Sequence, residues 1–269
     1  MTINKYIGSD SVVIAPDNID GYNVTGIGDY AFRDCTNIKD IKLPEALESI
    51  GYSAFRNCIG LESIKIPSKV KTIGDYAFSD CANIKDIKLP ETLESIGYYA
   101  FESCKGLESI KIPSKVKRIG QEAFEYCSNL KEINLPENIE TLGSEFIAGT
   151  KIEEIKIPKS IQTGWNALYR AYELKKVEFE EGTETVISGI CKANGINNKI
   201  EEIIIPNGVK EIEDSAFSGC INVKEIRLPE TLETIGYYAF GYCKGLESIK
   251  IPLKAVSYTH LRAHETLMN

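Results

Sequence analysis

Among the residue types of this chain, cysteine has the number and spacing that most readily suggest a chemical role. The 269 residues include eight cysteines, and three uses are open to them. They could form disulfides, ligate a metal, or pack in a core, where a free thiol behaves as a small apolar group. Seven recur at the ninth position of an internal repeat: Cys35, Cys58, Cys81, Cys104, Cys127, Cys220 and Cys243. Cys191 lies outside the pattern.

The spacing favours packing over both other uses. Side chains at one position of stacked parallel coils point the same way, which suits disulfide geometry poorly. Zinc sites usually use close pairs such as Cys-x-x-Cys, and the sequence contains none. Irregular units replace the thiol with Thr150, Ala171 and Asn194. We therefore predict that the seven repeated cysteines form a buried structural spine, with no metal and no cofactor.

The sequence also argues against catalysis. The two histidines, His260 and His264, lie four residues apart near the C-terminus, without the glutamate or third ligand of a zinc motif. If this segment is excluded, no histidine is left to activate a serine or cysteine nucleophile. No phosphate-binding glycine loop or dinucleotide fingerprint is present. We predict that the chain is not an enzyme.

Charge and hydropathy narrow the class of partner. A net charge of −8 and a pI of about 5.1 disfavour nucleic acid, which needs a basic surface. No apolar run approaches the roughly 20 residues of a membrane span. We expect a monomer that binds a protein ligand, without nucleic acid and without membrane insertion in this fragment.

An internal repeat positions the cysteines. Residues 27–72 and 73–118 are identical at 38 of 46 positions, and each block holds two 23-residue units that open Ile-Gly-x-x-Ala-Phe-x-x-Cys. A unit this short cannot bury its apolar face alone, so stacked neighbours must bury it, as in a solenoid. We predict about ten coils over residues 27–254, with irregular coils over 142–211. Residues 1–26 would form an N-terminal cap or first irregular coil.

Two kinds of element are expected in each unit. Ile64 and Ile66 alternate with a lysine and are followed by Pro67, which predicts a short strand with one buried face. Ile50, Ala54 and Cys58 are spaced by four, which predicts a helical turn or two. The fold class is therefore α/β, with a parallel sheet on one side of the solenoid and short helical turns on the other.

The pattern Leu-x-x-Ile-x-Ile-Pro-x-x-Val-x-x-Ile-Gly-x-x-Ala-Phe-x-x-Cys resembles the BspA-like, Treponema-type class of leucine-rich repeats. The resemblance covers residues 27–254 and departs from the commoner leucine-rich pattern at Lys69 and Thr92, where asparagine or cysteine is usual. It implies a curved, right-handed leucine-rich-repeat domain of bacterial and some protozoan surface proteins. Members are associated with adhesion to host proteins or to other cells, and the resemblance identifies no ligand.

Two sets of residues are candidates for contact with a partner. Basic side chains recur at one outward strand position: Lys42, Lys65, Lys88, Lys111, Lys156, Arg227 and Lys250. They form either a solvated face of mixed charge or a docking stripe for a polyanion or an acidic protein. The second candidate is the irregular stretch, which carries Trp165 and Tyr169, an insertion around 195–198, and Glu180 where proline is usual. Exceptions to a regular pattern are expected at functional sites.

The last residues differ in composition from the rest. Residues 255–269 break with the repeat and resemble a translated foreign end, so we expect a non-native or disordered tail and an array that continued further. Two functions stay open: a cell-surface, adhesin-type protein-recognition module, or a cytoplasmic scaffold or effector using the same face. The resemblance favours the cell surface or secretion, although no signal peptide is visible and the cytoplasm is possible.

Overall fold

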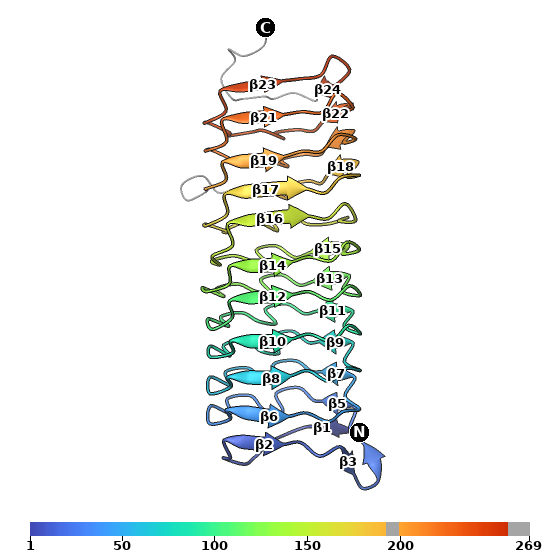
Figure 1. The fold of residues 1–269 in the computed structure, drawn as a ribbon, viewed down its shortest axis with the longest axis vertical. Helices are drawn as coiled ribbons and strands as arrows, with labels where there is room; N and C mark the ends of the chain where they lie inside the picture. The colour runs from blue at the N-terminus through green and yellow to red at the C-terminus, as the bar shows by residue number, and fades with distance from the viewer. Residues whose placement is uncertain (192–198, 258–269) are drawn as a thin grey trace.

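The computed structural model describes residues 1–191 and 199–257. These residues form one rod of stacked coils, with the N-terminus at one end and the C-terminal residues at the other (Figure 1). The chain rises as a right-handed solenoid with parallel strands. The predicted solenoid is confirmed, and its interior is one continuous apolar core along the rod.

One column of short parallel strands faces the viewer in Figure 1, and we call it the strand face. It contains β2 (Val12–Ile14), β6 (Asp40–Lys42), β8 (Ser63–Lys65), β10 (Asp86–Lys88), β12 (Ser109–Lys111), β14 (Glu132–Asn134), β16 (Glu154–Ile157), β17 (Lys176–Phe179), β19 (Glu202–Ile204), β21 (Glu225–Arg227) and β23 (Ser248–Lys250). Equivalent residues pair, as Lys88 does with Lys65. The described chain thus has about eleven coils rather than ten, because β2 pairs in register with β6 and adds one.

A second strand column was not predicted. It contains two-residue strands around the repeated Ile-Gly: β1 (Thr2–Ile3), β5 (Gly26–Ile27), β7 (Ser49–Ile50), β9 (Thr72–Ile73), β11 (Ser95–Ile96), β13 (Arg118–Ile119), β15 (Thr141–Leu142), β18 (Thr185–Val186), β20 (Glu211–Ile212), β22 (Thr234–Ile235) and β24 (Val256–Ser257). A hairpin of β3 (Asn18–Ile19) and β4 (Tyr22–Asn23) lies near the N-terminus. Pairing of β24 with β22 extends past the expected boundary at 254, while the rest of the tail, 258–269, lies outside the described residues.

The predicted helical turns are not formed, and no helix occurs in the described ranges. Positions four and eight of the units, such as Tyr30 and Asp34, have left-handed backbone, with φ of 60° and 61°. A right-handed helix cannot pass through such residues. The backbone N–H groups of these two positions, and that of the phenylalanine between them, instead donate to carbonyls of the next coil. The bonds of the first unit run from Tyr30 to Tyr52, from Phe32 to Ala54 and from Asp34 to Arg56, at 2.7 to 2.8 Å. We call this third side the turn side.

Phenylalanine dominates the core beneath the turn side. The rings of Phe32, Phe55, Phe78, Phe101 and Phe124 stack with centroids 5.1 to 5.4 Å apart and planes within 6° of parallel. At the Ile-Gly corner the coils approach even more closely. A Cβ on Gly97 would lie 2.6 Å from the backbone of Gly74 and Asp75, so only glycine fits there. Stacked identical side chains thus set the register of the coils.

Candidate functional site

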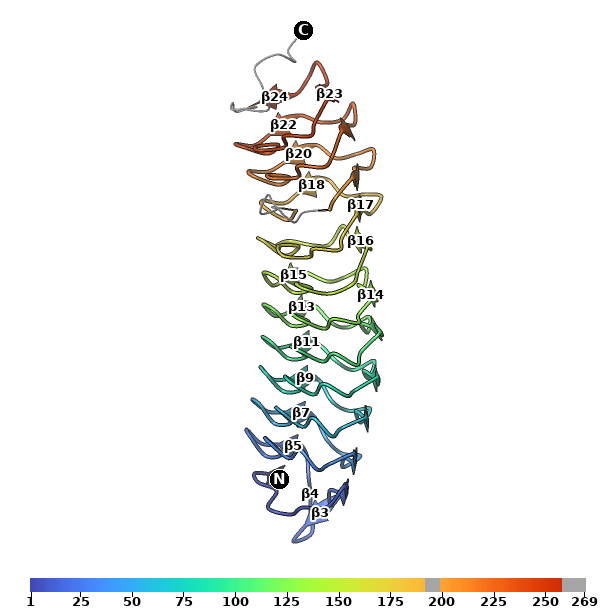
Figure 2. The ribbon, with the colours of Figure 1, turned by 90° about the vertical axis from the view of Figure 1, so that its left-hand side faces the viewer.

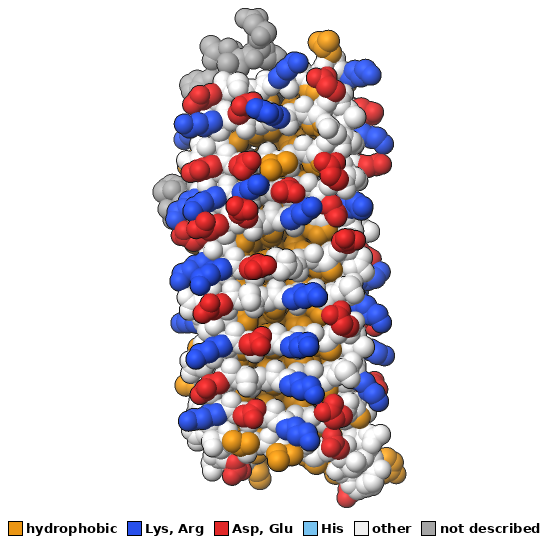
Figure 3. Space-filling view, viewed as in Figure 1, with side chains coloured by type: hydrophobic (Ala, Val, Ile, Leu, Met, Phe, Trp, Pro, Cys, Tyr) orange, Lys and Arg blue, Asp and Glu red, His pale blue; other side chains and the backbone are white. Residues whose placement is uncertain are grey.

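The lysine column predicted on the strand face lies there, but it is interrupted. Lys42, Lys65, Lys88 and Lys111 follow one another on β6, β8, β10 and β12, and all four are exposed while the isoleucine before each is buried. Above them the same position reads Asn134, Lys156, Glu178, Ile204, Arg227 and Lys250. Figure 3 shows the blue column over the lower coils, flanked by red side chains. We call the first four residues the lysine ladder.

Few ion pairs hold the lysine ladder in place. Lys65 Nζ lies 3.9 Å from Glu45, and both side chains are well exposed. Within the described ranges, Lys42, Lys88 and Lys111 have no carboxylate within 4.0 Å. Exposed pairs of this kind contribute about 0–1 kcal/mol. The ammonium groups therefore face solvent and do little for the fold.

Trp165 and Tyr169 lie on the turn side, away from the lysines. Figure 2 shows the strand face along one edge of the rod and the turn segments along the opposite edge. Trp165 is 49% exposed, and its ring lies over Gly189, where an added Cβ would be 2.7 Å from Cε3. Tyr169 is half-buried. The nine predicted contact residues thus do not form one surface, and the insertion at 195–198 lies outside the described residues.

The cysteines stack inside the turn side, and all eight are free thiols. Each repeated thiol beyond Cys35 is buried and donates to a backbone carbonyl in the preceding coil, mostly that of the repeated phenylalanine: Cys58 to Phe32, Cys81 to Phe55, Cys104 to Phe78, Cys127 to Phe101, Cys220 to Cys191 and Cys243 to Phe217, at 3.0 to 3.5 Å. Burial raises the pKa of Cys81 and Cys104 well above its usual range. No cluster of three potential metal ligands was found in the described part of the chain.

A partly buried charge cluster around Arg170 was not predicted. Its Nη1 lies 3.0 Å from both Glu125 and Glu145, and its Nε donates to the Tyr172 hydroxyl at 3.2 Å. Nη2 also donates to the Tyr126 hydroxyl. Arg170 occupies position eight, the second left-handed position of its unit, where most units carry a short polar residue or glycine. The side chain therefore ties three coils together, although its partners are up to 45 residues away.

Glu125 is the buried member of this cluster, with 5% of its side chain exposed. Burial, together with a hydrogen bond to the neighbouring Glu122 and the charge of that residue, raises the pKa of Glu125 from 4.5 to about 8. The raised pKa favours the protonated form of Glu125 near neutral pH, because a second charge beside Glu122 is unfavourable. This arrangement is structural, because Arg170 pairs with Glu125 and Glu145 and also donates hydrogen bonds to the hydroxyls of Tyr126 and Tyr172.

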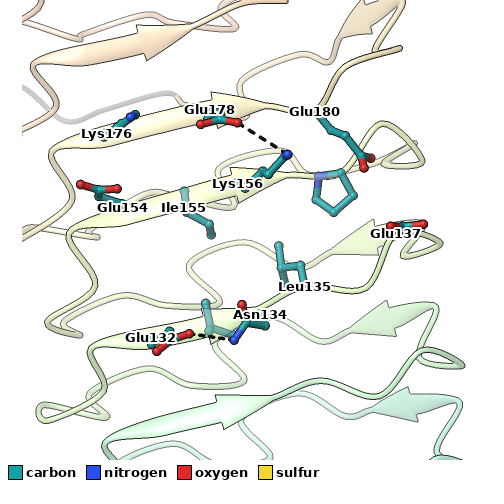
Figure 4. Close-up of a pocket in the computed structure, with 12 residues that line it drawn as sticks. Glu132, Asn134, Leu135, Glu137, Glu154, Ile155, Lys156, Lys176, Glu178 and Glu180 are labelled. Carbon is teal, nitrogen blue, oxygen red and sulfur yellow. Dashed lines mark hydrogen bonds and ion pairs between the residues drawn. The ribbon is translucent and has the colours of Figure 1, made fainter.

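A pocket of ≈ 420 Å³ opens on the strand face between β14 and β16. Its apolar lining includes Ile133, Leu135, Ile155 and Pro158, and its polar lining consists of Glu132, Asn134, Glu137, Glu154, Lys156, Lys176, Glu178 and Glu180. Figure 4 shows the charged side chains above and below the gap between the two strands. Glu178 and Glu180 belong to the irregular coils. These coils were predicted from the sequence as a candidate contact region, but no pocket was predicted there.

Glu180 takes the place of the proline that closes other strands. Its Oε2 accepts a hydrogen bond from the backbone N–H of Lys159, 3.1 Å away, in the preceding coil. Below it, the Asn134 amide donates to Glu132 at 2.9 Å, and Lys156 pairs with Glu178 at 3.6 Å. The pocket is thus bordered by side chains whose positions are partly fixed by neighbours.

Comparison with known proteins places the repeat in a family. The sequence model of the family described as BspA type leucine rich repeat region matches residues 17–129, 94–198 and 191–264. A leucine rich cell surface protein from Faecalibacterium prausnitzii A2-165 has 24% sequence identity and a TM-score of 0.62, over 94% of this chain and 85% of that one. The likeness to this structure shows a shared fold.

Two further solved structures are similar over most of their length. A leucine-rich repeat protein from Bacteroides ovatus ATCC 8483 is 28% identical, with a TM-score of 0.47 over 91% of this chain and 82% of that one. The leucine rich repeat protein of T. pallidum is 22% identical, with a TM-score of 0.42 over 82% of each chain. No curated protein sequence matched. In the ranges that the structure describes, no helix is long and apolar enough to span a membrane. The family matches cover most of the chain, and it belongs to the BspA-type leucine-rich repeat family.

Proposed function

We propose that the chain is a non-catalytic protein-recognition module of the adhesin type, displayed at the cell surface, and that its strand face docks an acidic region of a protein ligand. The observation that carries the proposal is the lysine ladder. Neighbouring strands are about 4.8 Å apart, so stacked ammonium groups repel one another by up to about 1 kcal/mol in water. A column of this kind does not stabilise the fold, and an acidic partner would relieve the repulsion.

The shape of the module supports the same conclusion. Parallel solenoids present extended surfaces, and protein ligands bind along them with many weak contacts. The outward positions of the strand face are not needed for packing, since the alternate residues are the buried ones. The F. prausnitzii protein of the same fold is described as a cell surface protein, which supports the proposed location.

Charge reversal of the lysine ladder tests the proposal. The variant replaces Lys42, Lys65, Lys88 and Lys111 with glutamate. The matched control replaces four exposed lysines outside the column: Lys69, Lys71, Lys105 and Lys115. Binding to a panel of purified extracellular-matrix proteins is measured by biolayer interferometry at low and high salt.

We expect the wild-type chain and the control to bind one panel member alike, while the ladder variant loses at least tenfold in affinity. Equal loss in both variants would mean that net charge alone acts, and no binding to any panel member would contradict the adhesin proposal. The double variant Trp165→Ala, Tyr169→Ala is a further arm of the experiment. Reduced affinity would place the ligand on the turn side as well, and unchanged affinity would remove those two residues from the proposed surface.

A further inference from the structure

The pocket between β14 and β16 differs in charge from the coils below it. Five glutamates and two lysines line it, which leaves a net charge of −3. Both lysines are already paired: Lys156 with Glu178 at 3.6 Å, and Lys176 with Glu202 at 3.8 Å. Glu137 and Glu154 have no cation within 4.0 Å in the described part of the chain. The lysine ladder thus ends directly below an acidic pocket.

The pocket lies where two sheets of the strand face adjoin. β14 pairs with β12, and β16 pairs with β17, so β14 and β16 belong to separate sheets. Asn134 stands where the ladder has lysine, and its side-chain amide donates to Glu132 of the same strand at 2.9 Å. Leu135 is partly buried and forms the apolar floor together with Ile133, Ile155 and Pro158.

We propose that this pocket is a subsite for an arginine side chain of the protein ligand that lies along the strand face. The inference rests on the proposed function and adds the direction in which the ligand segment lies along the strand face. A ligand segment would carry acidic residues opposite the lysine ladder and an arginine beyond Lys111. From β12 to the pocket is about one and a half coils, ~7 Å at the spacing of paired strands, which two extended residues span.

The chemistry of the lining favours arginine over other cations. The apolar floor accommodates the methylene stem, which long basic side chains bury readily. Carboxylates stand on both sides of the gap, and a planar guanidinium with five N–H groups can donate to several at once. Lysine offers a compact point charge that matches a single carboxylate. A metal ion requires ligands that converge, and the described residues hold no such group of three.

Methyl NMR of the whole chain tests the subsite with a defined probe. N-acetyl-arginine-N′-methylamide is titrated into the protein, and the citrulline analogue, which is neutral and of the same shape, is titrated in parallel. We expect shifts confined to the methyl groups of Ile133, Leu135 and Ile155 with arginine, and no shift with citrulline. Equal shifts with citrulline, or arginine shifts that avoid these methyls, would overturn the inference.

Two double variants identify the carboxylates involved. Glu137→Gln with Glu154→Gln removes the two unpaired pocket carboxylates and is expected to weaken arginine binding at least fivefold. Glu91→Gln with Glu247→Gln removes the same charge from exposed positions outside the pocket and should change binding less than twofold. An unchanged affinity in the first pair, with the methyl spectrum confirming an intact fold, would contradict the subsite.

The experiment separates this inference from the proposed function. The charge-reversed ladder variant is expected to bind the arginine probe at least as tightly as the wild type, because its four changes lie outside the pocket and add negative charge near it. Arginine binding in a chain that binds no matrix protein would refute the adhesin proposal and leave the subsite standing. Ladder-dependent binding of a matrix protein, without arginine binding in the pocket, would refute the subsite alone.

Discussion

Glu125 predicts a dependence of stability on pH that one substitution should remove. The folded protein raises the pKa of this carboxyl from 4.5 to about 8, so between these values the folded chain holds a proton that the unfolded chain releases. The stabilisation is complete below pH 4.5 and is lost as the pH rises through about 8. Glutamine does not titrate, yet it can donate to Glu122 and accept from Arg170.

The size of the effect follows from burial and screening. In a fully enclosed site the shift would correspond to about 5 kcal/mol. Arg170 and Glu145, however, have side chains 31% and 21% exposed, and solvent screens the cluster. We therefore expect the free energy of unfolding of the wild type to fall by about 2 kcal/mol more than that of Glu125→Gln between pH 5 and pH 9.

Urea unfolding followed by the fluorescence of Trp165 is the suitable assay. The indole is the single tryptophan, lies in the same coil as Arg170, and urea does not screen charges. The control Glu91→Gln removes an exposed carboxylate and should keep the wild-type profile. Parallel profiles for wild type and Glu125→Gln over this range would refute the raised pKa of Glu125, and a steeper fall in the variant would reverse the assigned sign.

Two further predictions concern the core. Phe78 is fully buried and stacks on Phe55 and Phe101 at 5.2 and 5.4 Å, so Phe78→Ala should lower the free energy of unfolding by about 3–5 kcal/mol. Tyr98→Ala, at a position 56% exposed, should change it by less than about 0.5 kcal/mol, and similar losses in both urea titrations would contradict the stacked core. Burial raises the pKa of Cys35 to about 11, so at pH 8 a disulfide reagent should label this partly exposed thiol slowly and the other seven only after urea is added. Rapid labelling of several native thiols would show that they do not form a closed column.

The inward-facing residues were predictable because repetition constrains them. A strand with one buried face must alternate, so Ile64 and Lys65 indicated both the strand and its orientation. Ile50, Ala54 and Cys58 share the four-residue spacing, and all three are buried. The four-residue spacing nevertheless led to the wrong prediction, because the structure has consecutive turns here and no helical turn. Two left-handed residues per unit bring the same positions inward through consecutive turns, and spacing alone does not distinguish such turns from a helix.

The pocket and the Arg170 cluster could not be predicted from the repeat. Arg170 contacts Glu125 at a distance of 45 residues along the chain, across two coils of unequal length. Residue spacing gives the order of the coils but not how far a long side chain reaches between them. The pocket is lined by residues of β14, β16 and β17, and these strands bury the same alternating positions as their neighbours, so the buried pattern does not indicate a pocket.

The difference between buried and outward positions explains where binding specificity can arise in such a rod. Buried positions must match the coil above and below, so a change there propagates as strain through the phenylalanine stack. An outward position touches only its neighbours in the column, and a single replacement such as Asn134 or Glu178 changes the local charge while the strand stays in register. A regular array alone would present one uniform charge pattern and bind any acidic surface. Asn134 and Glu178 break that uniformity, and a ligand that must satisfy both the lysine ladder and the acidic pocket can bind in one register and one direction only.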